Sequence, residues 1–155
     1  MREILFRGKS PLSGKWLYGV PVTRVYGGVP LMVSSAEYDD DGIVEFNHGF
    51  ADANSIGQFT GLFDKNGKSR IFEGDILKCV DGPNIEEKAV VRFGLHTMPN
   101  CNTKNSDLGF YLEWIGDEWG TLRQDVGFWS KKCEVIGNIH DNPDLLNEGG
   151  LTCNE

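Results

Sequence analysis

Hydrophobic and polar residues alternate with a period of two along much of the chain. The alternation is clearest in short segments rich in β-branched and aromatic residues: KWLYGV, DILKCV, KAVVRF, LGFYLEW and EVIGNI. Successive side chains of a strand point to opposite faces, so this pattern predicts short β-strands. Further candidates nearer the N-terminus are ILFRG, VPLMVS and GIVEF. Because no longer window shows a helical stripe, we predict a mainly β protein.

Turn residues separate the predicted strands and support this fold class. Residues that tolerate the positive φ of tight hairpins occur in three dipeptides: Asp41-Gly42, Asn66-Gly67 and Asp81-Gly82. Residues 94–107 are polar and show no period, which predicts a long loop between two strands.

A short helix is predicted near the C-terminus. Asp141 or Asn142 can cap it, and Pro143 suits its first position. Gly149 offers a stop, so the helix spans at most two turns. A chain of 155 residues fits one domain. We therefore expect a single β-rich domain over residues 1–148 and a flexible tail over residues 149–155.

The letters GKS within GLFDKNGKSRIF raise the question of a phosphate-binding loop. A Walker loop has four residues between its first glycine and the GK pair, whereas five separate Gly61 from Gly67. The loop would also hold Asp64, whose carboxylate repels phosphate. The segment that follows, RIFEGDILKCV, is a turn and a strand rather than the required helix. We predict a hairpin with Asn66-Gly67 at its tip, and no nucleotide site.

The same stretch carries a family resemblance. IGQFTGLFDKNGKSRIFEGDILK is similar to the central signature of the YopX family of phage and prophage proteins. REILFRGK, GKWLYG and EVIGNIHDNPDLL extend the likeness over nearly the whole chain, although Phe72 and Ser69-Arg70 depart from the usual residues. The resemblance implies a mainly β fold with an SH3-like barrel or roll, additional N-terminal strands and a phage or prophage origin. It supplies no catalytic residue and no substrate.

Charge is unevenly distributed along the chain, whose net charge is −8. Residues 1–24 hold five basic side chains and one acidic side chain, a net +4, so the remaining 131 residues carry −12. An acidic body repels a phosphate backbone, and we expect no nucleic-acid partner. The basic N-terminal part keeps nucleic-acid binding open as an alternative.

The length of the apolar runs and the spacing of the cysteines indicate the cellular compartment of the protein. No apolar run is long enough for a membrane helix, and MREILFRGKS lacks the apolar core of a signal peptide. We therefore expect no membrane partner. The cysteines are widely spaced and are interpreted as free thiols in a reducing compartment, the bacterial cytoplasm: Cys79, Cys101, Cys133 and Cys153.

Metal and cofactor chemistry finds little support in the spacing of ligand residues. Structural zinc sites use two close pairs of ligands, and neither His96 with Cys101 nor Cys133 with His140 has that spacing. DDDG at residues 39–42 lacks the spaced ligands of a calcium loop. We expect no metal and no cofactor.

Glu73 and Asp75, in the segment EGDIL, are the only paired carboxylates that suggest acid–base chemistry. They can share a face of an extended segment, which keeps a carboxylate-based enzyme open as an alternative. The favoured interpretation is structural, because an aspartate that enters a strand after a turn commonly accepts hydrogen bonds from turn amides.

The tryptophans divide into two pairs. Trp16 and Trp114 lie in strand alternations and are expected in the core. Trp119 and Trp129 flank charged, glycine-bearing segments and are the candidate protein-contact residues. The alternative is a small core packed under loops.

The leading hypothesis is a non-enzymatic protein-binding or assembly module that contacts a host protein, a phage protein or a second copy of itself. A nucleic-acid-associated small barrel comes second, and a carboxylate-based enzyme third.

Overall fold

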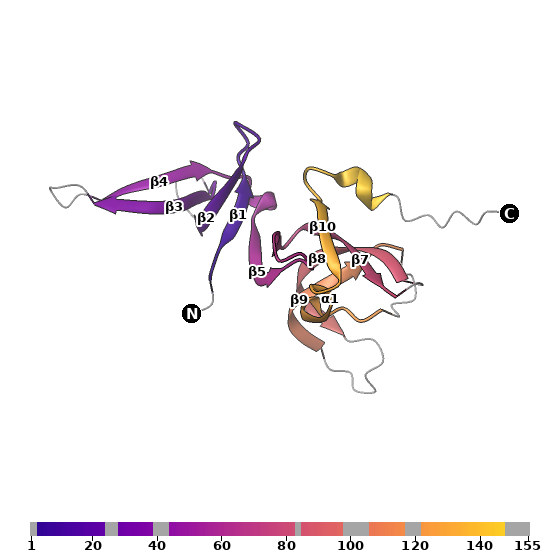
Figure 1. Cartoon of the computed structure of the whole chain (residues 1–155). Coiled ribbons are helices and arrows are strands. Elements are labelled where there is room, and N and C mark those ends of the chain that lie inside the picture. The colour runs from indigo at the N-terminus through magenta and orange to yellow at the C-terminus, as the bar shows by residue number, and fades with distance from the viewer. Residues whose placement is uncertain are drawn as a thin grey trace. The chain divides into compact units, whose positions relative to one another are not determined.

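A computed structural model of the chain shows a mainly β protein with two open antiparallel sheets (Figure 1). It describes residues 3–23, 28–38, 44–82, 85–97, 106–116 and 122–147. The chain divides into two compact units, Met1–Gly61 and Leu62–Glu155. The division falls inside a strand, so no linker of unusual composition marks it.

The first unit consists of antiparallel strands and one short 3-10 helix. In chain order its elements are β1 (Phe6–Lys9), β2 (Trp16–Val22), β3 (Leu31–Tyr38), β4 (Val44–Phe50), η1 (Ala53–Ser55) and the start of β5 (Gly57–Phe63). The strand order is β4-β3-β2-β1-β5, with β6 next after β5 in the same sheet. The N-terminal strand candidates are thus confirmed.

One face of this first sheet is closely packed. Met32 and Ala51 are buried there. A side chain at position 8 has no room, because a Cβ added to Gly8 would lie 2.8 Å from the Cβ of Ala51. The backbone amide of Lys9 donates a hydrogen bond to the Ser55 hydroxyl at 2.7 Å, which ties η1 to β1.

The second unit contains a four-stranded sheet with the order β10-β7-β8-β9. Its elements are β6 (Arg70–Phe72), β7 (Asp75–Asp81), β8 (Ile85–Thr97), β9 (Ser106–Trp114), α1 (Val126–Trp129), β10 (Cys133–Asn138) and the 3-10 helix η2 (Pro143–Leu146). All neighbouring strands in it run antiparallel.

Alternate residues of this sheet supply the core, as the period-two pattern predicts. The buried cluster comprises Ile71, Leu77, Cys79, Ala89, Val91, Leu112, Val126, Trp129 and Cys133. Two of its members come from α1, which begins where the Asp125 carboxylate accepts a hydrogen bond from the Phe128 amide. The sequence did not predict α1, because four residues are too few to show a helical stripe.

Two predictions of local structure differ from the structure. Residues 94–97 and 106–107, expected in a loop, continue β8 and β9 as paired strands. Glycine and polar residues interrupt the alternation there, so the strands could not be followed to their ends. The short helix expected near the C-terminus is present only as a single 3-10 turn, Pro143–Leu146, and is not confirmed as an α-helix. The Asn142 side chain does not cap it, but accepts a hydrogen bond from the Asn138 amide.

The expectation of free thiols is also wrong for one pair of cysteines. Cys79 of β7 lies directly opposite Cys133 of β10, and their sulfur atoms form a disulfide. Both residues are fully buried. Spacing along the chain gave no sign of this bond, because the register of β7 against β10 alone brings the two residues together. Cys101 and Cys153 lie outside the described residues.

Candidate functional site

The carboxylate of Asp64 bonds to the backbone of the turn that connects β5 to β6. Oδ1 of Asp64 accepts hydrogen bonds from the backbone amides of Asn66, Lys68 and Ser69, each at 3.2 Å. Gly67 has a φ of 67°, which suits the tip of a hairpin. The predicted hairpin is confirmed. The amides that a phosphate loop would offer to its ligand are already bonded to an internal anion.

Opposing effects act on the pKa of Asp64. Burial raises it, whereas the hydrogen bonds from Ser69, Lys68 and Asn66 lower it by more, so the pKa lies below its ordinary value of 3.8. The ionised form is therefore the one that holds the turn together.

Asp75 has the structural role that the sequence favoured. Its side chain is 1% exposed, and Oδ2 accepts a hydrogen bond from the Phe72 amide at 2.7 Å. Glu73 lies in the turn that connects β6 to β7 and is half-buried. The two carboxylates consequently do not form an open pair on one strand face, as the enzyme alternative needs.

Ligand residues for a metal do not gather in the described part of the chain: no group of three histidine, cysteine, aspartate or glutamate side chains is placed to hold an ion. His96 lies on β8, and the candidate partner Cys101 lies outside the described ranges.

Trp129 belongs to the core and not to the surface, so its assignment as a contact residue does not fit the structure. It is 2% exposed, and its ring lies edge-on to that of Trp114, with 4.9 Å between centroids. Its indole Nε1 donates a hydrogen bond to the carbonyl oxygen of Arg123 at 2.8 Å. The alternative of a small core under loops is right that Trp129 is buried, but Trp129 lies on α1 in the main core cluster of the second unit. Trp119 lies outside the described residues.

A row of exposed and half-buried apolar side chains instead lies on the hairpin of β8 and β9. Phe93 pairs with Phe110, and Leu95 pairs with Leu108, so all four side chains share one face. The two phenyl rings lie edge to face, 5.1 Å apart. We call these residues the apolar ladder: Phe93, Leu95, Leu108 and Phe110.

The apolar ladder continues the core-facing side of the hairpin beyond the core. Val91 and Leu112, one pair before it, are fully buried. Exposure then rises to 50% at Phe93 and to 72% and 69% at Leu95 and Leu108. Contiguous apolar surface that stays in water is typical of interaction sites.

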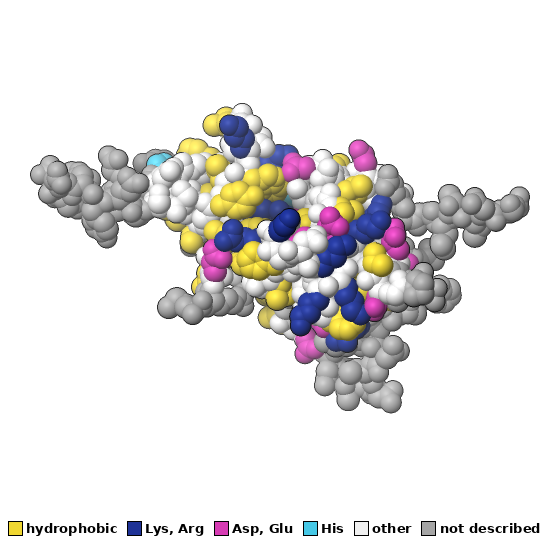
Figure 2. Space-filling model, in the orientation of Figure 1, with side chains coloured by type: hydrophobic (Ala, Val, Ile, Leu, Met, Phe, Trp, Pro, Cys, Tyr) yellow, Lys and Arg dark blue, Asp and Glu magenta, His cyan; other side chains and the backbone are white. Residues whose placement is uncertain are grey.

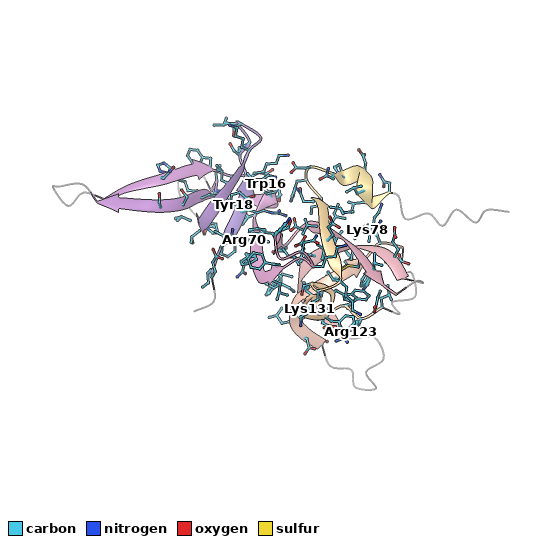
Figure 3. The ribbon with its side chains drawn as sticks, viewed as in Figure 1. Trp16, Tyr18, Arg70, Lys78, Arg123 and Lys131 are labelled. Atoms are coloured by element: carbon cyan, nitrogen blue, oxygen red, sulfur yellow. A yellow bond between two sulfur atoms is a disulfide. The ribbon has the colours of Figure 1, made fainter. Side chains whose placement is uncertain are left out.

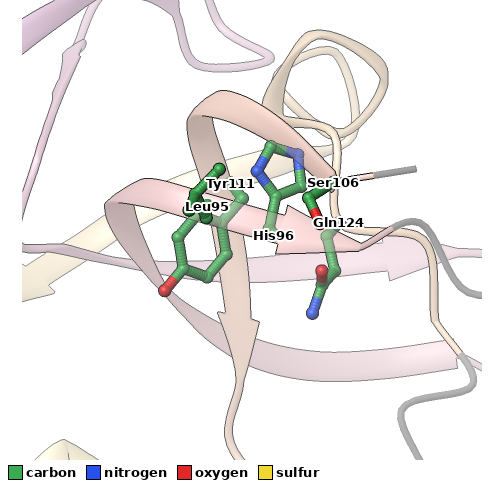
Figure 4. Close-up of a pocket in the computed structure, with 5 residues that line it drawn as sticks. All are labelled: Leu95, His96, Ser106, Tyr111 and Gln124. Atoms are coloured by element: carbon green, nitrogen blue, oxygen red, sulfur yellow. The ribbon is translucent and has the colours of Figure 1, made fainter. Parts of the chain in front are cut away.

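The opposite face of the same hairpin is more polar, and a shallow hollow lies at the outer end of the hairpin, lined by residues of both faces (Figure 4). The rings of His96 and Tyr111 stack there, with centroids 5.0 Å apart. Leu95 and Ser106, which have the parity of the ladder face, complete the lining together with Gln124. The hollow has a volume of about 250 Å³. This volume is below the range of roughly 300–1,000 Å³ usual for small-molecule sites. The hairpin thus has one apolar and one more polar face at its outer end.

A second apolar surface lies on β2 of the first unit (Figure 3). Tyr18 and Val20 are about half exposed, at 49% and 51%, on the same strand face as Trp16. The guanidinium of Arg7 lies over the Trp16 ring, 4.6 Å from its centroid. Trp16, expected in the core, is only half-buried. Sequence alternation predicted this shared face, but not that it meets solvent.

Charged side chains of the second unit are mixed in sign, as Figure 2 shows for the visible face. Ion pairs between them include Lys65–Glu134, Lys78–Glu86, Arg92–Glu113, Arg123–Asp125 and Lys132–Asp81. Cations that are paired with neighbouring carboxylates do not form the continuous basic stripe that follows a phosphate backbone.

Comparison with known families decides the relationship. Residues 6–147 match the family described as YopX protein, which covers nearly the whole chain. The chain belongs to the YopX family. No curated protein matches it. In the described part of this YopX chain, no helix has the length and apolarity needed to cross a membrane.

The apolar ladder is the feature of this YopX chain that sequence reasoning missed. A signal was present: Leu108, Phe110 and Leu112 keep one parity along β9, and Val91, Phe93 and Leu95 keep one parity along β8. Leu108 is already the first residue of the predicted strand LGFYLEW, and Leu95 extends KAVVRF by one further apolar residue. Pairing the two series would have shown that they continue together past the core.

Proposed function

We propose that this YopX-family chain is a phage- or prophage-type protein that acts as a non-enzymatic protein-binding or assembly module, with the apolar ladder as its contact surface. The observation that supports the proposal is the continuity of the ladder with the core face of β8 and β9, from fully buried Val91 to 72% exposed Leu95. Contiguous apolar side chains left in water on a folded domain typically mark a surface that another molecule covers.

The energetics favour a protein as the covering partner. Burial of apolar surface contributes roughly 25 cal/mol per Å², and aromatic residues at the centre of a contact dominate binding. Phe93 and Phe110 lie between the core and the exposed leucines, which gives the surface a rigid aromatic base.

Two finer features belong to the same proposal. An SH3-like roll for the second unit is supported by the family and by a small antiparallel sheet with a short helix packed on its core. Action in the cytoplasm of a bacterial host is supported by the family's phage association, whereas the buried disulfide between Cys79 and Cys133 is unusual for a reducing compartment.

A capture experiment tests the proposed function. Wild-type protein and the variants Leu95→Ser and Leu12→Ser are each used to capture proteins, including added copies of the chain, from extracts of phage-carrying bacteria. Leu12 is a matched control, because it is 89% exposed and lies in the first unit. We expect a partner that is retained by wild type and Leu12→Ser but reduced about tenfold or more with Leu95→Ser, a difference of about 1.4 kcal/mol.

Equal thermal unfolding of the three proteins shows that the substitutions leave the fold intact. Equal capture by all three would contradict the ladder as the contact surface. Catalytic turnover that is lost in Asp75→Asn would favour the enzyme alternative instead.

A further inference from the structure

The disulfide lies at the start of an edge strand. β10 is the outermost strand in the sheet order β10-β7-β8-β9, and Cys133 is its first residue. Cys79 lies directly opposite on β7. The pairing of β10 with β7 is irregular between Val135 and Gly137, so only a short regular stretch of pairing follows the bond. The disulfide therefore holds the end of β10 at which this stretch begins.

Both cysteines are shielded from solvent. Cys79 and Cys133 are 0% exposed and belong to the buried cluster that includes Leu77 and Trp129. A disulfide forms or breaks when a thiolate attacks a sulfur atom, so the attacking group must reach that atom. The folded chain can therefore exchange this bond only after some part of the second unit has opened.

In the oxidised chain the required opening is extensive. The bond itself holds Cys133 against β7, so β10 cannot separate from its neighbour at this end. A reagent reaches the sulfur atoms only when the surrounding cluster comes apart. That cluster draws on several elements of the second unit: Ile71 of β6, Ala89 and Val91 of β8, Leu112 of β9, and Val126 and Trp129 of α1. Reduction thus requires much of the second unit to unfold.

In the reduced chain a smaller opening is enough, because β10 can then separate from β7 at Cys133. The Val80 amide donates a hydrogen bond to the Lys132 carbonyl at 3.3 Å, and the Lys65 amide donates to the Cys133 carbonyl at 2.9 Å. Lys65 also pairs with Glu134, but both side chains are exposed, and such ion pairs contribute little to stability. Segments at an edge open at a lower free energy than core strands do.

We propose that Cys79 and Cys133 form a redox latch, which closes through local opening of β10 and is released only when the second unit unfolds. Closure uses a small disulfide such as glutathione disulfide. One cysteine thiolate attacks a sulfur of that molecule and releases one glutathione, and the second cysteine then displaces the other. The pair thus loses two electrons and two protons, which leave with two glutathione thiols. A dithiol reductant reverses the reaction and becomes a disulfide itself.

The latch reconciles a buried disulfide with synthesis in a reducing compartment. A chain that folds in such a compartment keeps both thiols, and it gains the cross-link after it meets an oxidising environment, as on lysis of the cell. Once closed, the bond resists reduction for as long as the second unit stays folded. This inference does not involve the apolar ladder and goes beyond the proposed function.

The test compares how urea affects the two directions of exchange in the full chain. Peptide mass mapping follows Cys79 and Cys133 separately from the other cysteines. Reduction of the oxidised protein by dithiothreitol should accelerate steeply with urea, with a slope close to that of equilibrium unfolding. Without urea it should be at least about a hundredfold slower than in the urea-unfolded protein. Oxidation of the reduced protein by glutathione disulfide should depend only weakly on urea below the unfolding transition, because a local opening exposes little surface.

Two variants with matched ion pairs locate the opening. Lys65→Ala removes the ion pair with Glu134 beside β10 and keeps the backbone amide. Arg92→Ala removes a similarly exposed pair with Glu113 on β8 and β9, away from β10. Lys65→Ala should accelerate oxidation of the reduced protein about two- to fivefold, whereas Arg92→Ala should not. Both variants should change the rate of reduction equally little.

Three results would overturn the proposal. The first is reduction of the folded protein at a rate that urea does not change, which would mean that the bond opens locally. The second is a folded, reduced protein whose Cys79 and Cys133 do not oxidise with glutathione disulfide. The third is equal acceleration of oxidation by Lys65→Ala and Arg92→Ala, which would place the opening elsewhere in the unit.

Discussion

Among single residues, Asp64 is the one whose ionisation is tied most directly to local structure. Its carboxylate accepts hydrogen bonds from three backbone amides in one turn. Asp64→Asn keeps an oxygen in place but removes the charge, and charge-assisted hydrogen bonds are roughly twice as strong as neutral ones. We expect the variant to lower the free energy of unfolding at neutral pH by about 1–2 kcal/mol, as measured by urea denaturation.

The pKa of Asp64 gives this prediction a pH dependence. The folded chain holds that pKa below its ordinary value of 3.8, so the unfolded chain binds more protons near that pH. The stabilisation is therefore fully present well above pH 3.8 and is lost as the pH falls through the folded pKa. The difference in the free energy of unfolding between wild type and Asp64→Asn should therefore disappear at acidic pH. If this difference in stability persists down to about pH 2, the charge of Asp64 is not its cause.

Gly67 makes a backbone contribution to the same turn. Its φ of 67° is strained for most side chains, and no neighbouring atom lies within 4 Å of an added Cβ. Gly67→Val should lower stability by about 1–3 kcal/mol through strain alone. Gly67→Asn is the matched control, since asparagine tolerates this conformation, and it should lower stability much less. Equal melting temperatures for the two variants would argue against the strain.

At the level of elements, the disulfide fixes β10 to β7. Cys79 and Cys133 are 54 residues apart, so the bond restricts a long loop of the unfolded chain. Loop-closure entropy for that length predicts a stabilisation of about 4 kcal/mol relative to the reduced protein. Urea unfolding with and without reductant measures it. The Cys79→Ala, Cys133→Ala double variant is the control and should not respond to reductant.

The same elements show how far sequence reasoning reaches. Alternation located the centre of β8, where Ala89, Val91 and Phe93 alternate with Lys88, Val90 and Arg92. Beyond Gly94 the alternation no longer indicates a strand, because a single leucine lies there between glycine and histidine. Alternation also assigns residues to a strand face but does not indicate which face is exposed to solvent. It therefore does not predict the exposure of Tyr18 on β2. Strand pairing supplies both missing facts, and it depends on contacts distant in sequence.

For the whole molecule, acidity is the property that decides which partners can approach. The net charge is −8, and several cations of the second unit are already paired with carboxylates. We expect mobility-shift assays at physiological salt to show no binding of duplex DNA, single-stranded DNA or RNA tighter than about 10 μM. Submicromolar binding that weakens in the Lys9→Ala, Lys15→Ala double variant would support the nucleic-acid alternative.

The division into two units is the whole-molecule feature that the sequence left hidden. Domain boundaries are usually recognised by linkers rich in glycine, proline or polar residues. Here the boundary after Gly61 falls within β5, where GQFTGLF reads as an ordinary strand. The composition of the sequence therefore does not indicate the boundary between the two units, and the family match spans this boundary.

The bond between Cys79 and Cys133 has a consequence for the chain after it is cut by a protease. Any single cleavage between these residues, including one within residues 98–105, leaves the two fragments covalently joined. Limited digestion should thus yield an intact-sized band on a non-reducing gel and two smaller bands once reductant is added. A nicked molecule would keep β10 attached to β7, and the core strands on both sides of the cut would remain in one particle.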